Sequence, residues 1–251
     1  MNVNLNIKIM RPLKISLIFF LMTIVINDLS AQAFNDTLQS YVNSVVDEFD
    51  KIPKNRKKVL NKISDYMYQE WTARRVLQPL FICTHNSRRS QLAQVWLTAA
   101  NQYYGVFTVN SFSGGSKATT FNLRAVESLR RVGILVTKVD TSSDSNPVYK
   151  IVINQKYKPI YNYSKAYNSE ENPKKDFFAI IVCSTKDESC PVAKEAKARF
   201  YLPYIDPRYA DKTVSETKTY DDTCREVARE MFYIMAQLKS KVIDDIEKVR
   251  K

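Results

Sequence analysis

Residues 77–90 read Leu-Gln-Pro-Leu-Phe-Ile-Cys-Thr-His-Asn-Ser-Arg-Arg-Ser, and this stretch decides the fold that we expect. An apolar run ends abruptly at Cys83, and a helical pattern of apolar residues follows Ser90: Leu92, Val95, Trp96, Ala99 and Ala100. The order predicts a strand, a short loop and a helix, with Cys83 at the head of the loop and Arg89 at its tail. A loop that leads into a helix directs backbone N–H groups and the positive end of the helix dipole at one point, so it can bind a tetrahedral oxyanion.

Cysteine chemistry follows from the same arrangement. The field at a helix N-terminus stabilises a thiolate, the planar fork of Arg89 can clamp two anion oxygens, and the Ser90 hydroxyl can donate to the sulfur. Cys83 is therefore the predicted nucleophile, and an oxyanion receptor shares its loop. The predicted oxyanion-binding residues are Thr84, His85, Asn86, Ser87, Arg88 and Arg89. The alternative is a buried structural cysteine beside two arginines of an ordinary surface.

The segment Cys-Thr-His-Asn-Ser-Arg-Arg-Ser-Gln, residues 83–91, resembles the phosphate loop of the low-molecular-weight protein tyrosine phosphatases and of the related thioredoxin-coupled arsenate reductases. The run from Ser113-Gly-Gly to Asn122-Leu-Arg-Ala125 is similar to the segment that follows the loop in this superfamily. The resemblance extends from about Leu80 to about Leu238. It implies an enzyme of this superfamily.

Further site residues are implied by the resemblance. Asp206, which precedes Pro207, corresponds to the general acid that protonates a leaving oxygen, although Asp-Pro is also a common turn. The segment from Cys183 to Cys190 is similar to the resolving-cysteine segment of the reductases, in which both thiols take part in exchange. A structural disulfide or two indifferent thiols are the alternatives. Cys224, on an expected helix, has no counterpart and indicates packing.

Two departures from the superfamily pattern bear on the loop. Glycine usually stands where this chain has His85, and histidine adopts a positive φ less easily than glycine. A cation site of some reductases uses a carboxylate where Gln94 stands, so we expect no bound potassium. One histidine and no C-x2-C pair leave little for a zinc site, so neither a metal nor another cofactor is expected.

The 251 residues have a formal net charge of +12, which suits anionic ligands. Lysine and arginine are spread along the chain without a basic stripe of interleaved aromatics, so a nucleic-acid partner is not expected. With 45% hydrophobic residues, the chain can bury a sizeable core, and this composition argues against global disorder.

Residues 1–33 are typical of a secretory signal. A basic start precedes an apolar run from Ile15 to Ile26 and an Ala31-Gln-Ala33 cleavage pattern. The run is shorter than the roughly 20 residues that a comfortable membrane span needs, so we expect a cleaved signal, export to the periplasm and no other membrane contact. The alternatives are an uncleaved anchor and a cytoplasmic protein that starts at Met22.

The remaining pattern alternates strands with helices, which predicts an α/β fold with a four-stranded parallel, doubly wound sheet. An added pair of helices is expected in residues 34–75, before a catalytic domain of residues 76–251. Within that domain we expect strands at 106–111 and 177–182, a turn at 113–115, and helices at 121–132, 191–197 and 221–248. Residues 141–175 form an insertion with a strand near 148–153, either a rim or lid over the site or a surface hairpin.

Three functions fit these residues. The first is an arsenate reductase in which Cys83 attacks arsenate, Cys183 and Cys190 act as resolving thiols, and a thioredoxin-like protein is the reductant. The second is a phosphatase that hydrolyses phosphotyrosine through Cys83, Arg89 and Asp206. The third is a non-catalytic oxyanion-binding module in which His85 has spoiled the loop.

Overall fold

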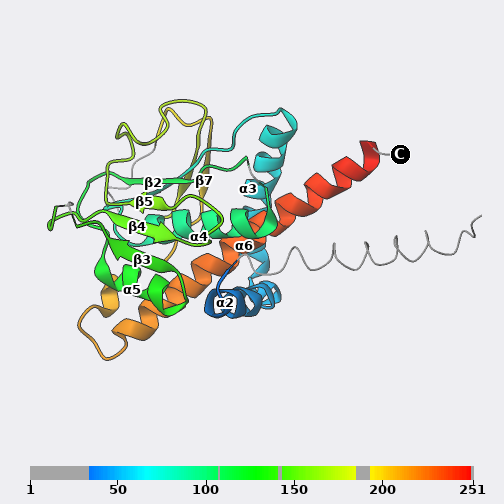
Figure 1. Cartoon of the computed structure of the whole chain (residues 1–251). Coiled ribbons are helices and arrows are strands. Elements are labelled where there is room, and N and C mark those ends of the chain that lie inside the picture. The colour runs from blue at the N-terminus through cyan, green and yellow to red at the C-terminus, as the bar shows by residue number, and fades with distance from the viewer. Residues whose placement is uncertain (1–33, 107, 141–142, 185–192, 250–251) are drawn as a thin grey trace, which may run out of the picture.

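A computed structural model describes residues 34–106, 108–140, 143–184 and 193–249 (Figure 1). Its centre is a four-stranded parallel sheet in the order β2-β1-β6-β7. The strands are β1 (Pro79–Cys83), β2 (Phe112–Gly115), β6 (Phe178–Ile181) and β7 (Ala198–Tyr201). The predicted α/β class and the four-stranded parallel sheet are confirmed.

The register of the sheet brings the ends of the strands to one edge. Ile82 of β1 lies opposite Gly114 of β2 and Ile181 of β6, so these strands end at the same level. All residues of β1 and β6 are buried, as expected of continuous apolar runs in the middle of a parallel sheet. The residues that follow β1, β6 and β7 therefore meet at the carboxyl edge, where open parallel sheets place their ligand sites.

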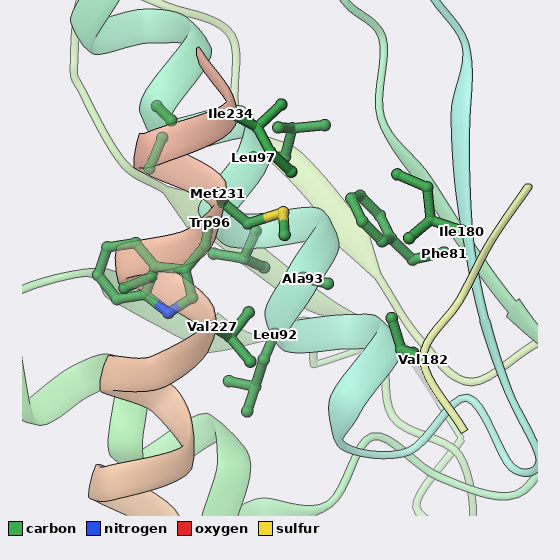
Figure 2. Packing of buried hydrophobic residues seen from close by; sticks show 14 of the residues in the cluster. Phe81, Leu92, Ala93, Trp96, Leu97, Ile180, Val182, Val227, Met231 and Ile234 are labelled. Carbon is green, nitrogen blue, oxygen red and sulfur yellow. The ribbon is translucent and has the colours of Figure 1, made fainter. Parts of the chain in front are cut away.

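Helices cover the sheet and pack on one another. Helix α4 (Arg89–Tyr104) packs against β1 and β2, and the long helix α6 (Glu216–Val249) packs along α4 and against α5 (Leu123–Arg131). Figure 2 shows apolar side chains of α6 meeting those of α4: Val227, Met231 and Ile234 approach Leu92, Trp96 and Leu97. All six side chains are fully buried, so this contact is a principal part of the core.

The expected N-terminal helical pair is present as α2 (Asp36–Val46) and α3 (Lys54–Thr72), with the short 3-10 helix η1 (Phe49–Lys51) between them. Asn35 caps α2 because its side chain accepts a hydrogen bond from the Leu38 N–H at 3.0 Å. Both helices bury an apolar face on α6, which makes them part of the core rather than an appendage.

The insertion contributes to a second sheet that was not expected. Strands β3 (Leu135–Lys138), β4 (Tyr149–Val152) and β5 (Ile160–Asn162) pair antiparallel in that order. The strand expected near 148–153 is β4. After β5 the chain returns to the carboxyl edge of the parallel sheet, where Gly115 and Ala166 form an isolated bridge.

Three predicted segments differ in the structure. In the segment predicted as a strand at 106–111, Val109 forms a single parallel bridge with Leu77, but the strand itself, β2, is Phe112–Gly115 and takes the place of the predicted turn at 113–115. The two glycines are needed there because a Cβ on Gly115 would lie 2.7 Å from the Asn86 nitrogen, and one on Gly114 would lie 2.3 Å from the Tyr167 Cα. The described part of the helix expected at 191–197 forms turns that lead into β7, and Pro191 lies outside the described residues.

The other boundaries agree with their predictions to within a few residues. Helix α5 occupies the predicted 121–132 segment, and Gly133 follows it with φ 94°, as a helix-ending glycine does. Asp206 caps a 3-10 helix, η2 (Pro207–Ala210), before α6. Across the described ranges, no helix is long and apolar enough to cross a membrane, and the predicted signal at 1–33 lies outside them.

Candidate active site

The predicted loop lies between β1 and α4. Cys83 ends β1 with 3% of its surface exposed, and α4 begins at Arg89. The positive φ of the loop falls on Asn86 at 45°, not on His85. Asparagine is one of the residues that tolerate this conformation best, so the histidine does not strain the loop. The sequence-based concern about His85 is therefore wrong.

Hydrogen bonds around Asn86 determine where the Ser90 proton points. Asn86 Oδ1 accepts from the Lys165 N–H at 2.9 Å and from Gln91 Nε2 at 3.1 Å, which fixes the orientation of its amide. Its Nδ2 then donates to Ser90 Oγ at 2.9 Å. Since that oxygen already accepts a proton, its own hydroxyl is left to donate to Cys83 Sγ, 3.1 Å away. A donor in this position stabilises a thiolate.

Carbonyl groups of the loop are held from outside it. Thr84 O accepts from the Lys117 N–H at 3.0 Å, and Ser87 O accepts from the Asn122 N–H at 2.9 Å. His85 O accepts from the hydroxyls of Thr119 and Ser164. A loop whose carbonyls are anchored in this way is kept in one conformation.

The two arginines of the loop lie differently. Arg89 is 2% exposed, and it donates from Nη1 to Tyr204 O at 3.2 Å and from Nη2 to Asp206 Oδ2 at 3.0 Å. Arg88 Nε donates to the hydroxyl of Tyr220 at 2.8 Å, and its Nη2 lies 3.5 Å from Asp211. Arg88 was predicted as an oxyanion ligand, but these contacts direct its guanidinium toward α6 and η2.

Asp206 comes to the loop from the far side of the sheet. Its Oδ1 accepts from the Arg208 N–H at 3.1 Å, which caps η2, and its Oδ2 meets Arg89. The sheet thus brings Cys83, Ser90, Arg89 and Asp206 together, although more than a hundred residues separate the first from the last. Burial, followed by the charges of Arg208 and Arg88, lowers the pKa of His85, so the imidazole beside this group is neutral at pH 7.

Residues of the insertion that were not predicted from the sequence support the loop through hydrogen bonds. Buried Asn162 of β5 donates to Gln91 Oε1 at 2.8 Å and to Gln94 Oε1 at 3.1 Å, and Gln91 in turn donates to Asn86 and to Tyr163 O. The 162–167 part of the insertion is thus a buttress for the loop, while β4 and β5 before it form an antiparallel hairpin. No local pattern marks the buttress, because its partners lie about 70 residues earlier in the chain.

The second expected thiol is also at the carboxyl edge. Cys183 follows β6 and is 5% exposed, and its Sγ lies 3.9 Å from Ile82 O and 4.0 Å from Thr84 Oγ1. Cys183 is disulfide-bonded, whereas Cys83 and Cys224 are free. Cys190 lies outside the described residues. Cys224 is fully buried on α6, where burial raises its pKa to about 11, which agrees with the predicted packing role.

Metal ligands are not grouped in the described part of the chain, where no cluster of three or more His, Cys, Asp or Glu residues is found. Gln94 stands where some relatives carry a carboxylate. Its Nε2 donates to Ser111 O at 3.1 Å, and its Oε1 accepts from Asn162. The amide is engaged at both ends in protein hydrogen bonds.

Comparisons with known proteins bear on the superfamily. No family model matches the chain. The curated protein arsenate reductase 2 of Staphylococcus haemolyticus is 28% identical over 142 residues, which cover 57% of this chain and 86% of that protein. This similarity confirms the superfamily predicted from the loop. The same similarity supports the predicted enzyme class, which is either arsenate reductase or low-molecular-weight protein tyrosine phosphatase.

Solved structures with a similar fold are more distant. An arsenate reductase from Archaeoglobus fulgidus is 16% identical with a TM-score of 0.41, over 63% of this chain and 98% of that one. A low-molecular-weight protein tyrosine phosphatase from T. tengcongensis is 19% identical with a TM-score of 0.40, over 66% of this chain and 99% of that one.

Proposed function

We propose that this chain reduces arsenate, with Cys83 as the nucleophile and Cys183 as the first resolving thiol. One observation supports this choice above the others: the Cys183 sulfur lies against Ile82 and Thr84, the two residues that flank Cys83. Phosphate-ester hydrolysis needs a single thiolate and gives no reason for a second cysteine at this place.

In the proposed cycle, two electrons pass from a pair of cysteine thiols to arsenic. The Cys83 thiolate attacks arsenic and displaces an oxygen as water, which leaves an S–As(V) bond. The Cys183 thiolate then attacks the Cys83 sulfur, a disulfide forms, and the electron pair of the S–As bond stays on arsenic, which leaves as arsenite. Cys190 attacks Cys183, frees Cys83 and closes a second disulfide, which a thioredoxin-like dithiol reduces.

The thiol states agree with the last stage of that cycle. Cys83 is free and Cys183 is disulfide-bonded, as they are when the oxidising equivalents have left the nucleophile and an external reductant has yet to act. Ser90 and Arg89 serve the first step: the hydroxyl stabilises the attacking thiolate, and the guanidinium binds the oxyanion. The pairing of Cys183 with Cys190 is part of the proposal.

A phosphatase is the second candidate, supported by the contact of Asp206 with Arg89 at 3.0 Å. This contact places a carboxyl group at the mouth of the loop, where it can give a proton to the leaving oxygen of a phosphate ester bound at Cys83. Arsenate reduction needs a proton as well, because the hydroxyl displaced from arsenic must take one up to leave as water, so the same carboxyl group can serve either reaction.

The test is to measure both reactions on one preparation: arsenate reduction with thioredoxin and thioredoxin reductase, and hydrolysis of an aryl phosphate. Cys183→Ser should abolish arsenate reduction and leave ester hydrolysis within about threefold, because only the first reaction needs a second thiol. Cys224→Ala is the matched control, a buried cysteine remote from the loop, and should change neither. Arsenate reduction that survives Cys183→Ser would contradict the proposed cycle.

A protein that binds phosphate but performs neither reaction would instead be the non-catalytic module.

Export, if residues 1–33 direct it, adds a condition to the expected arsenate reduction. In an oxidising compartment the second thiol pair would rest as a disulfide. We expect such material to hydrolyse aryl phosphate, and to reduce arsenate only after a dithiol has reopened the disulfide. Thiol counting by mass spectrometry on protein from its native compartment checks the premise.

A further inference from the structure

One arginine of the added helix α3 reaches the segment that leads to Asp206. Arg56 Nη1 donates to Pro203 O at 2.9 Å, and its guanidinium carbon lies 4.7 Å from the centre of the Tyr204 ring. Arg56 therefore holds two successive residues of this segment, one through the backbone and one through the ring.

The same arginine is fixed by a buried carboxylate of α6. Its Nε and Nη2 form a bidentate pair with Glu230 at 2.6 and 2.8 Å, and the Glu230 side chain is 1% exposed. The hydroxyl of Tyr204 donates to the same carboxylate at 2.5 Å. Burial raises the pKa of Tyr204 well above its ordinary value, so the hydroxyl keeps this proton. Arg56, Glu230 and Tyr204 thus form a closed cluster from three parts of the chain.

The held segment makes the contacts that orient the oxyanion site. Tyr204 O accepts from Arg89 Nη1, and Asp206, two residues further on, accepts from Arg89 Nη2. The direction of the Arg89 fork is therefore set by residues 204 and 206. Tyr204 in turn keeps its place through Arg56 and Glu230, and Asp206 follows it by two residues.

We infer that Arg56 is a positioning residue of the active site, and that helix α3 fixes the Arg89 fork and the Asp206 carboxyl through Tyr204 and Glu230. The inference rests on the proposed function of the Cys83 loop as an oxyanion site. It gives the added helix a part in the chemistry, although no atom of Arg56 touches the substrate. Misplacing a catalytic group by about 1 Å can cost on the order of a hundredfold in rate, so a remote clamp of this kind has a measurable effect.

Stability alone must be separated from positioning, because removal of one partner from a buried ion pair destabilises a fold whatever else it does. Arg56→Lys keeps a cation opposite Glu230, yet a single ammonium cannot form the bidentate pair and also reach Pro203 O. The double variant Arg56→Gln with Glu230→Gln leaves no buried charge without a partner. Glu48→Gln is the matched control. It breaks ion pairs between the same N-terminal extension and α6, because the α6 partners of Glu48 are Arg225 and Arg229, which lie outside the 203–206 segment.

The primary measurement is the affinity for inorganic phosphate by calorimetry on the full chain, well below each variant's Tm. Phosphate has neither a leaving group nor a redox step, so the result does not depend on which reaction the enzyme performs. We expect Arg56→Lys and the double variant to raise the phosphate Kd about tenfold, as part of a charged hydrogen-bond contribution is lost. We expect kcat/KM to fall about a hundredfold, with most of the fall in kcat. Glu48→Gln should lower Tm and leave both constants within twofold.

A phosphate Kd within twofold of wild type in both Arg56 variants would overturn the inference, whatever happens to Tm. If Arg56→Lys does not fold, the phosphate Kd of the double variant alone decides the outcome. If the wild-type chain binds phosphate and both Arg56 variants have the same phosphate Kd, the positioning role of Arg56 is refuted and the proposed function still stands. A wild-type chain that binds no phosphate would overturn the proposed function and this inference together.

Discussion

At the scale of single residues, one amide orients the hydroxyl that faces Cys83, the nucleophile of our proposal. Asn86 stands in the left-handed region, and its Oδ1 is occupied by two donors, so its Nδ2 faces Ser90. The consequence is a hydroxyl proton aimed at Cys83. In our proposal the charge of Arg89 then serves the oxyanion rather than the thiolate. In this proposal, Ser90 stabilises the Cys83 thiolate and Arg89 binds the oxyanion that the thiolate attacks, so neighbouring residues of one loop serve the two reaction partners separately.

Ser90→Ala tests this division. We expect kcat/KM to fall about tenfold to a hundredfold, because a thiolate loses a hydrogen bond to a charged acceptor. Alkylation of Cys83 by iodoacetamide at pH 7 should slow, while the phosphate Kd stays within about threefold. Ser128→Ala is the control, since that buried hydroxyl donates to a carbonyl within α5, far from the loop. Unchanged alkylation in Ser90→Ala would show that the serine is only a packing residue.

Asp206→Asn tests the proton donor of the phosphatase reaction. An ester with a poor leaving group should slow by on the order of a hundredfold or more, whereas one with a good leaving group should slow far less, because only the poor one needs the proton. Arsenate reduction should slow as well, because the displaced hydroxyl must take up a proton to leave as water. Asp221→Asn, which breaks an exposed pair with Arg131, should leave all three rates alone. Equal slowing of both esters would make Asp206 a structural residue of η2.

At the scale of elements, local pattern predicted some parts of the fold and failed at others. The unit of β1, loop and α4 was predictable because its apolar run and its helical period are contiguous. Strand β2 was not, since Val-Phe-Thr-Val has a stronger strand propensity than Phe-Ser-Gly-Gly. Close packing overrides that propensity: the backbones of the loop and of Tyr167 approach Gly114 and Gly115 too closely for any side chain. The buttress at 162–167 has no local signature, because its partners lie in the loop and in α4.

Gly115→Ala tests the close approach. Its Cβ would lie 2.8 Å from Thr84 O and 3.0 Å from Cys83 O as well as 2.7 Å from the Asn86 nitrogen, all backbone atoms, so the loop itself must shift. We expect a loss of about 1–3 kcal/mol of stability and at least a tenfold rise in the phosphate Kd. Gly133→Ala, at φ 94° and against the Leu38 nitrogen, should cost similar stability with phosphate binding intact. Equal Kd values in the two variants would refute the role of Gly115 in shaping the loop.

At the scale of the whole molecule, α6 joins the added helices to the catalytic sheet. Its apolar face packs on α4, and its charged side chains pair with the extension at two places, Arg56 with Glu230 and Glu48 with Arg225 and Arg229. The first pair contacts the segment that leads to Asp206, through Pro203 O and the Tyr204 hydroxyl, whereas the second joins Glu48 to α6. The extension is therefore attached by contacts of which one is functional by our inference and the other purely structural.

The second attachment should depend on pH. The hydrogen bond from Arg225, with a further contribution from Lys51, lowers the pKa of Glu48 from 4.5 to about 2. Because the folded-state pKa is the lower one, this stabilisation is complete above about pH 4.5 and is lost as the pH falls toward 2. At roughly 1.4 kcal/mol per pKa unit, reduced for solvent screening, it amounts to about 1–2 kcal/mol.

Urea unfolding of the wild type and of Glu48→Gln, followed from pH 7 down to pH 2.5, measures this contribution. The wild type should be the more stable of the two by about 1–2 kcal/mol at pH 6–7. The two should converge below pH 4.5, because a protonated glutamic acid and a glutamine are both neutral acceptors opposite Arg225. Glu230, which is buried and paired with Arg56, is intact in both proteins, so the acid response of that pair cancels in the difference. A gap between the two proteins that stays constant across the range would mean that Glu48 acts through packing rather than through its charge.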